Sequence, residues 1–252
     1  MNIKGFPFDS FTPATNKLML DLGIEQTLID FASANIERND VAHRHDHVED
    51  VVLKVFEYYN ALYDTADTSL VIDEKRQAVM AALLHDIGCW MDRDAHHLIA
   101  SNWVLSLRED QFSQMFYGIN PDDITAVAVA ILEHRASWKF TRKSAVSDIV
   151  AAADRGSFCP KEYLRRAYLY GRSKLKMRGS EALVRAVDHF MEKYKDGGYV
   201  YEAMPEICKR LNQAGIAEIK AAANNRTWCE DTIAENMLEW EVTYEEMTNA
   251  SS

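Results

Sequence analysis

The sequence is poor in the residues that build tight turns and covalent cross-links. Its 252 residues include only ten glycines, five prolines and four cysteines. So few turn formers argue against a turn-rich all-β protein and leave room for long helices. The cysteines are scattered and form no C-x-x-C pair, so they predict neither a disulfide framework nor a cysteine zinc site. They are Cys89, Cys159, Cys208 and Cys229.

Long apolar segments are also missing. No stretch approaches the ~20 apolar residues that a membrane-spanning helix needs. The first seven residues, MNIKGFP, lack the apolar core and cleavage pattern of a signal peptide. We therefore expect a cytoplasmic protein with reduced thiols and no membrane partner.

Positive charge is in deficit over the chain as a whole. There are 28 Lys and Arg against 39 Asp and Glu, a net charge of −11. Proteins that coat nucleic acids present a basic surface instead, so bulk nucleic-acid binding is not expected. The deficit is uneven, because residues 135–178 hold twelve basic and three acidic residues, a net charge of +9. Such a local field suits a nucleotide-sized anion or a short oligonucleotide.

Apolar residues recur at spacings of three and four along the chain, and strict alternation is nearly absent, which predicts an all-α fold. We expect a helical bundle with additional N- and C-terminal helices, forming a single helical domain over 1–252. Its parts are a core at 40–160, an N-terminal helical extension at 1–39 and a C-terminal helical extension at 161–252. The predicted helices cover 15–36 with a break at Gly23, 45–63, 73–86, 94–107, 121–134, 144–154, 160–170, 180–194, 205–223 and 229–247.

Histidines on apolar helix faces are the most informative residues. His47, for example, precedes Val51 by four residues and Val55 by eight, so it shares their core-facing side. Buried imidazoles and carboxylates require partners. They could hydrogen-bond one another, but a divalent metal satisfies them better, because these groups are the ligands of Mn, Fe, Mg or Zn in a nitrogen and oxygen site. The inward-facing set is His47, His85, Asp86, His96, His134 and Asp154.

Two His-Asp pairs compete for the central position in such a site. His45-Asp46 lies among polar neighbours at a predicted helix start, where Asp46 is a candidate N-cap. His85-Asp86 follows the apolar run at 81–84, which makes it the ligand pair. His97 is an alternative to His96, although it falls one residue off the apolar stripe. The remaining histidines, His43, His45 and His189, are interpreted as solvent-facing or capping residues.

These elements resemble the HD-domain superfamily of metal-dependent phosphohydrolases, and its small HDIG-type members in particular. The family's doublet is matched by residues 81–88, AALLHDIG, and its upstream histidine element by residues 47–51, HVEDV. The late aspartate is matched by residues 151–155, AAADR, where Ala152 replaces an aspartate that the family often has. The two intervening histidine elements are matched by residues 96–101 and 130–135. The resemblance spans about residues 47–155, the HD core.

The resemblance implies a ligand set and a substrate class. His47, His85, Asp86 and Asp154 would bind one ion, and His96 and His134 would hold a second ion or contact substrate. One or two ions of Mn, Mg, Fe or Zn are expected, and Asp86 would orient the attacking water. The cations that follow the ligands are candidates for binding substrate phosphate and stabilising its developing charge. They are Arg135, Lys139, Arg142 and Arg155.

We therefore predict a metal-dependent phosphohydrolase. It would cleave a phosphoester or phosphoanhydride of a nucleotide or similar small phosphate compound through a metal-bound hydroxide. His96, His134 and Arg135 join Asp86 as the expected catalytic residues. Two alternatives stay open, an HD-fold di-iron oxygenase and a nucleotide-binding regulatory module without turnover. The helices after Ser180 lie outside the resemblance and could build a lid or a homodimer contact.

Overall fold

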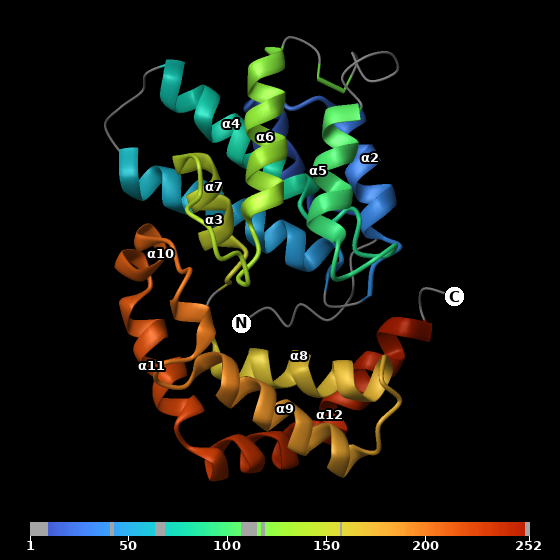
Figure 1. The fold of residues 1–252 in the computed structure, drawn as a ribbon. Helices are drawn as coiled ribbons and strands as arrows, with labels where there is room; N and C mark the ends of the chain where they lie inside the picture. The colour runs from blue at the N-terminus through green and yellow to red at the C-terminus, as the bar shows by residue number, and fades with distance from the viewer. Residues whose placement is uncertain are drawn as a thin grey trace. The chain divides into compact units, whose positions relative to one another are not determined.

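The structure is a computed structural model that describes residues 10–40, 43–63, 69–106, 115–116, 119–156 and 158–249. Those residues form helices and no strand, which confirms the all-α prediction (Figure 1). None of their helices has both the length and the apolar composition needed to cross a membrane. The helices are α1 (Pro13–Asp21), α2 (Gln26–Ile36), α3 (His45–Tyr63), α4 (Ser69–Leu84), α5 (His96–Ser106), α6 (Pro121–Glu133), α7 (Ala145–Ala153), α8 (Pro160–Ser173), α9 (Gly179–Tyr194), the short 3₁₀ helix η2 (Tyr199–Tyr201), α10 (Glu206–Leu211), α11 (Gln213–Ala223) and α12 (Arg226–Asn249).

The described chain divides into two compact units. The larger unit comprises residues up to 156 together with Pro205–Leu211, and the smaller unit comprises residues 158–204 and 212–249. The predicted core at 40–160 falls almost entirely in the larger unit, and most of the predicted C-terminal extension falls in the smaller one. The expectation of a single domain over 1–252 stays a prediction.

Helix α4 is the central element of the larger unit. It packs against α3, α6 and α7, and α5 packs against α6 (Figure 1). Residues 78–84 of α4, AVMAALL, are all buried, so this helix is apolar on every side over its last two turns. A helix of that kind belongs in a core rather than on a surface. Its C-terminal end, and whatever follows it, are thereby held inside the unit.

The N-terminal helices α1 and α2 are separated where the sequence predicts a break. Gly23 adopts a φ of +80°, a conformation that residues with a Cβ rarely adopt. Helix α1 is then tied to α3 by Glu49, a buried carboxylate that accepts hydrogen bonds from the Thr12 amide and from the Thr15 hydroxyl. These contacts attach the N-terminal segment to the helix that carries His47.

One predicted helix is two in the structure. The sequence predicts a continuous helix over 205–223, but α10 ends at Leu211 and α11 begins at Gln213. Asn212 between them has φ −119° and ψ 27°, which is not helical. The two helices also pack in different units. Helix α10 contacts α7 in the larger unit, and α11 contacts α8, α9 and α12 in the smaller unit. Periodicity alone could not reveal that division.

The smaller unit is a bundle of α8, α9, α11 and α12. Glu241 on α12 accepts hydrogen bonds from the Tyr168 hydroxyl at 2.5 Å and from the Arg172 guanidinium at 2.6 Å, both on α8. Helix α12 also exposes two large apolar side chains one turn apart, Leu238 and Val242. The predicted homodimer contact or lid formed by helices after Ser180 stays a prediction.

Candidate metal centre

The ligand-type side chains of the larger unit lie at the ends of helices α3 to α7. His47 is in the first turn of α3, and His96 is the first residue of α5. His134 and Asp154 directly follow α6 and α7 as C-cap residues. The doublet His85-Asp86 directly follows α4. Because the negative ends of helix dipoles lie at C-termini, the ends of α4, α6 and α7 favour a cation at this place.

Backbone carbonyls fix the orientation of three of the imidazoles. His85 and His134 each donate the Nδ1–H to the carbonyl three residues earlier, at 2.7 and 2.6 Å. His96 makes the same contact at 2.6 Å. A carbonyl only accepts hydrogen bonds, so Nδ1 carries the hydrogen and Nε2 is the atom that faces the neighbouring side chains. The acceptors are the carbonyls of Ala82, Ile131 and Arg93.

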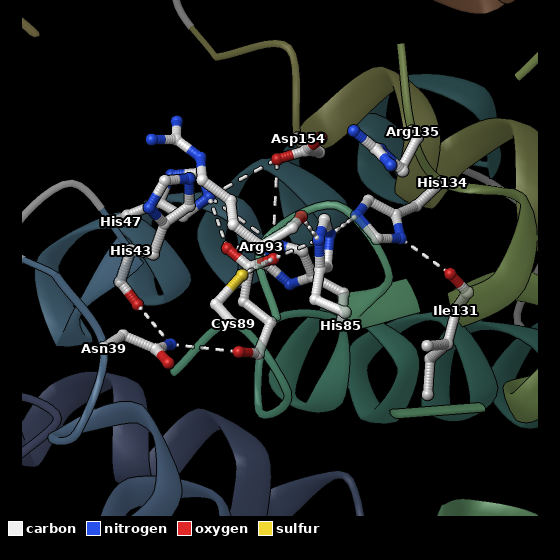
Figure 2. Close-up of polar contacts among 12 residues, drawn as sticks. Asn39, His43, His47, His85, Cys89, Arg93, Ile131, His134, Arg135 and Asp154 are labelled. Atoms are coloured by element: carbon white, nitrogen blue, oxygen red, sulfur yellow. Dashed lines mark hydrogen bonds and ion pairs between the residues drawn. The ribbon is translucent and has the colours of Figure 1, made fainter. Parts of the chain in front are cut away.

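Four of the predicted ligands converge on one point, and Figure 2 labels three of them, His47, His85 and Asp154. His47 Nε2 lies 3.3 Å from Asp154 Oδ1 and 3.5 Å from Asp86 Oδ2. His85 Nε2 lies 3.3 Å from the same Asp86 oxygen and 3.6 Å from the same Asp154 oxygen. The two Nε2 atoms are 3.4 Å apart. The structure therefore brings together the four residues that the sequence predicts for one ion.

The two remaining predicted ligands form a pair beside this group. His96 Nε2 lies 3.1 Å from His134 Nε2 and 3.3 Å from Asp86 Oδ1. Asp86 thus faces both sets of imidazoles, one with each carboxylate oxygen. All six predicted metal ligands belong to one continuous cluster.

The contacts of the cluster fit a cation better than hydrogen bonds among its members. Ligand atoms bound ~2.0–2.2 Å from one ion lie ~3.0–3.6 Å from each other, and the neighbouring donor atoms here are 3.1–3.6 Å apart. The facing Nε2 atoms of His96 and His134 are both acceptors when the rings are neutral, so their lone pairs repel unless a cation lies between them. Asp86 Oδ2 is buried without a hydrogen bond of good geometry, although such an atom normally has one, and the Nε2 atoms of His85 and His47 lie 3.3 and 3.5 Å from it. The donor set therefore fits a divalent ion.

Burial and neighbouring charges shift the pKa values of the cluster in opposite directions. Burial would raise the pKa of Asp86, but the imidazoles of His85 and His47 outweigh it and hold that pKa well below its usual value. Burial would lower the pKa of His85, but Asp86 and Asp154 outweigh it and raise that pKa well above 6.5. Burial lowers the pKa of His134 to about 3. His134 is thus neutral, and able to act as a metal ligand, at any pH well above this value.

Arg135 directly follows the cluster residue His134, as Arg155 follows Asp154. It lies beside His134 in Figure 2, and its guanidinium donates a hydrogen bond to the carbonyl of Asp94. About 29% of its side chain is exposed, so it can reach a bound anion as well. Lys139 is exposed on the segment that follows. The predicted roles of both in binding substrate stay predictions.

Two other predicted substrate-binding residues have structural contacts in the described chain. Arg142 is largely buried and donates to the carbonyls of Glu133 and Arg135, at 3.0 and 3.4 Å. Arg155 is only 4% exposed and donates to the carbonyl of Ala151. Both guanidinium groups therefore hold helix ends of the larger unit, and any contact with substrate would be additional to that.

Three further histidines, His43, His45 and His97, lie outside the six-residue cluster. His45 is a correction to the sequence analysis, because it is buried rather than solvent-facing and its Nε2 lies 2.7 Å from the hydroxyl of Ser33. Its neighbours on α3 did not reveal this, because its partners Ser33 and Phe11 lie outside α3. His43 Nδ1 lies 2.9 Å from Asp40. His96, rather than His97, groups with Asp86 among the described residues whose ligand atoms lie within 4.8 Å of one another.

Two residues of the site have no counterpart in the sequence analysis. Asn39 is buried, and its amide donates to the backbone carbonyls of Asp86 and His43, both at 2.9 Å. Cys89 donates a hydrogen bond from Sγ to Asp86 Oδ1 at 3.3 Å. No spacing rule points to Asn39, since it is 47 residues from Asp86. The i+3 position of Cys89 after Asp86 is the only sequence feature that could have indicated its role.

We expect Asn39→Ala to loosen the site, because it removes one of the two donors to the Asp86 carbonyl and leaves only the Cys89 amide. The loss of one hydrogen bond costs about 0.5–1.5 kcal/mol, and the loss of a residue that orients a ligand lowers metal affinity by roughly 10–100-fold. Thermal unfolding and a metal titration would measure both. Asn35→Ala is the matched control, because the Asn35 amide donates only within α2. Equal effects of the two substitutions would show that Asn39 does not orient the site.

Comparison of the chain with family models, with curated proteins and with solved structures finds no match. The site is therefore defined by its own geometry: six imidazole and carboxylate side chains from the ends of five helices, with donor atoms 3.1–3.6 Å apart.

Proposed function

We propose that this protein is a metal-dependent phosphohydrolase that acts on a nucleotide or a similar small phosphate compound. The observation that carries the proposal is the convergence of His47, His85 and Asp154 with Asp86, which also faces His96 and His134. The order of these ligands along the chain is the order in which the HD-domain superfamily resembled by the sequence has them. The fit of the cluster to a cation supports the same proposal.

The residues of the cluster would hold the ion through His47, His85, Asp86 and Asp154. A divalent ion bound there supplies a water of lowered pKa and polarises a phosphoryl oxygen. Asp86 stays ionised because its pKa is held low by the imidazoles of His85 and His47 against the effect of burial. An ionised carboxylate only accepts hydrogen bonds, so Asp86 can orient a nucleophilic water by accepting a hydrogen bond from it.

Cationic side chains near the cluster would bind the phosphate of the substrate. Arg135 follows His134 directly, and its partly exposed guanidinium can donate two parallel hydrogen bonds to phosphoryl oxygens. Lys139 is exposed four residues later. Charge of this kind stabilises the phosphoryl oxygens as negative charge develops on them. A phosphate monoester or anhydride is the substrate class that such groups favour.

The proposal is tested by metal analysis of the purified protein and by phosphate release from a panel of nucleotides and phosphate esters. Supporting results are bound Mn, Fe, Zn or Mg and a release of phosphate that stops when the ion is chelated and resumes when it is restored. Iron with consumption of oxygen would identify an oxygenase instead, and tight nucleotide binding without turnover a regulatory module. A protein that binds no divalent ion would contradict the proposal at its first step.

A further inference from the structure

The turn after α4 brings a cysteine to the edge of the metal cluster. The backbone amide of Cys89 donates to the carbonyl of Asp86 at 3.0 Å, which closes a tight turn and places the two side chains on the same side. Cys89 Sγ then lies 3.3 Å from Asp86 Oδ1. His96 Nε2 lies 3.3 Å from that same oxygen. The sulfur, oxygen and nitrogen atoms are all within 4.8 Å of one another.

A glycine makes this approach possible. A Cβ at Gly88 would lie 3.0 Å from the carbonyl oxygen of His96 and 3.0 Å from two side-chain atoms of Ile99. Only a residue without a side chain therefore lets the turn come this close to the start of α5. The contact between the turn and α5 is what places Cys89 beside His96.

A hydrogen bond from the thiol to Asp86 does not satisfy the polar atoms around it. It supplies a donor to Oδ1, but Asp86 Oδ2 is still buried without a partner, on a residue that is only 2% exposed. It also supplies nothing to the Nε2 lone pair of His96, which faces that of His134 at 3.1 Å. Asp86 Oδ2 faces His47 and His85, whereas the His96 lone pair lies on the side of Oδ1 and Cys89. A cation beside Oδ1 would satisfy the His96 lone pair, and Oδ2 belongs to the neighbouring position.

The distances match a mixed sulfur, nitrogen and oxygen site. Ligand atoms around one zinc ion, with bonds of ~2.0–2.1 Å to nitrogen or oxygen and ~2.3 Å to sulfur, lie ~3.3–3.6 Å from each other. The two separations measured from Asp86 Oδ1 are both 3.3 Å. Two of the three separations therefore match an ion site, and the third, between Cys89 Sγ and His96 Nε2, is within 4.8 Å.

We propose that Cys89, Asp86 and His96 form a second cation position, in which the Cys89 sulfur is a metal ligand. The inference rests on the metal centre of the proposed function and deepens it by naming the class of ion. Coordination replaces the thiol proton, which passes to solvent water. A thiolate ligand selects ions such as Zn²⁺, Fe²⁺ or Co²⁺ over Mg²⁺ and Mn²⁺. The position next to Asp86 would therefore hold one of the thiophilic ions.

Cobalt titration of the full-length, metal-free protein tests this directly, because Co²⁺ bound to sulfur gives a charge-transfer absorption in the near ultraviolet that nitrogen and oxygen ligands do not give. We expect the band in the wild type and its loss in Cys89→Ser, with the visible cobalt bands of the remaining ligands retained. Cys159→Ser is the matched control, since Cys159 is an exposed cysteine and its removal should leave the band unchanged. Cys89→Ala serves the same purpose if the serine variant does not fold.

The outcomes separate this inference from the proposed function. Visible cobalt bands without a charge-transfer band in the wild type would overturn the role of Cys89 and leave the His and Asp centre standing. A band that disappears in Cys159→Ser and persists in Cys89→Ser would overturn it as well. If no cobalt binds at all, the metal centre itself is refuted and the inference with it. A zinc affinity reduced at least tenfold by Cys89→Ser, with unchanged Mg²⁺ affinity, would support it independently.

Discussion

Asp86→Ala is expected to abolish turnover while leaving the protein folded. Asp86 is the carboxylate shared by the whole cluster, with Oδ2 facing His47 and His85 and Oδ1 facing His96. Its removal takes a carboxylate ligand from both the His47 and His85 side and the His96 side of the cluster. It also removes the acceptor that would orient the attacking water. We expect kcat on any substrate that the wild type hydrolyses to fall by at least about 10³-fold, a barrier increase of about 4 kcal/mol.

The sequence contains a matched control for this substitution. Asp46 also follows a histidine, but it is exposed in the first turn of α3, so Asp46→Ala should leave activity and metal content nearly unchanged. His85→Ala is expected to behave like Asp86→Ala, because His85 is a fully buried member of the same group. Metal content, circular dichroism and phosphate release should be measured on all three variants. Full phosphatase activity in either doublet variant would refute the assignment of the doublet.

Metal affinity is expected to increase as the pH rises around neutrality. In the metal-free protein, Asp86 and Asp154 raise the pKa of His85 well above 6.5, although burial opposes them. The raised pKa favours the protonated form of His85, and the ion must displace that proton. Each proton displaced changes the apparent affinity by up to about tenfold per pH unit, as long as the pH is below the pKa of that group. Binding at pH 8 should therefore be tighter than binding at pH 6.

His96 and His134 are expected to contribute little to proton release on metal binding. Burial lowers the pKa of His134 to about 3, so it is already neutral at these pH values, and burial also lowers the pKa of His96, which favours its neutral form. Calorimetric titrations at pH 6, 7 and 8, in buffers with different ionisation enthalpies, would give both the affinity and the number of protons released. An affinity that does not change with pH would mean that no protonated histidine competes with the ion.

The same shifts set how the stability of the metal-free protein depends on pH. The raised pKa of His85 contributes stability that is fully present below about 6.5 and is lost as the pH rises through its folded-state pKa. The lowered pKa values of Asp86 and Asp154, held down by His47 and His85 against burial, contribute stability that is lost as the pH falls below about 3.8. Bound metal reverses the first trend, because it replaces the proton on His85.

Much of the site could be predicted because helix periodicity reports which face a side chain occupies. His134, three residues after Ile131 on an amphipathic helix, had to face the core with it, and the structure places both there. The same rule could not place His45, since its partner Ser33 belongs to another helix. Nor could periodicity separate α10 from α11. The break at Asn212 lies where the chain passes from the larger unit to the smaller one, and local spacing does not report that change.

The short supply of glycine, proline and cysteine, together with helical periodicity, was enough to determine an all-α fold and the six residues on its inner faces, because both depend only on local spacing. Distances between side chains from different helices depend on how those helices pack. Tertiary structure alone therefore decided that neighbouring donors of the cluster lie 3.1–3.6 Å apart, that Asn39 supports the doublet, and that the side chains of Arg142 and Arg155 are buried. It also decided that Cys89, one of four cysteines with no paired spacing, lies beside Asp86.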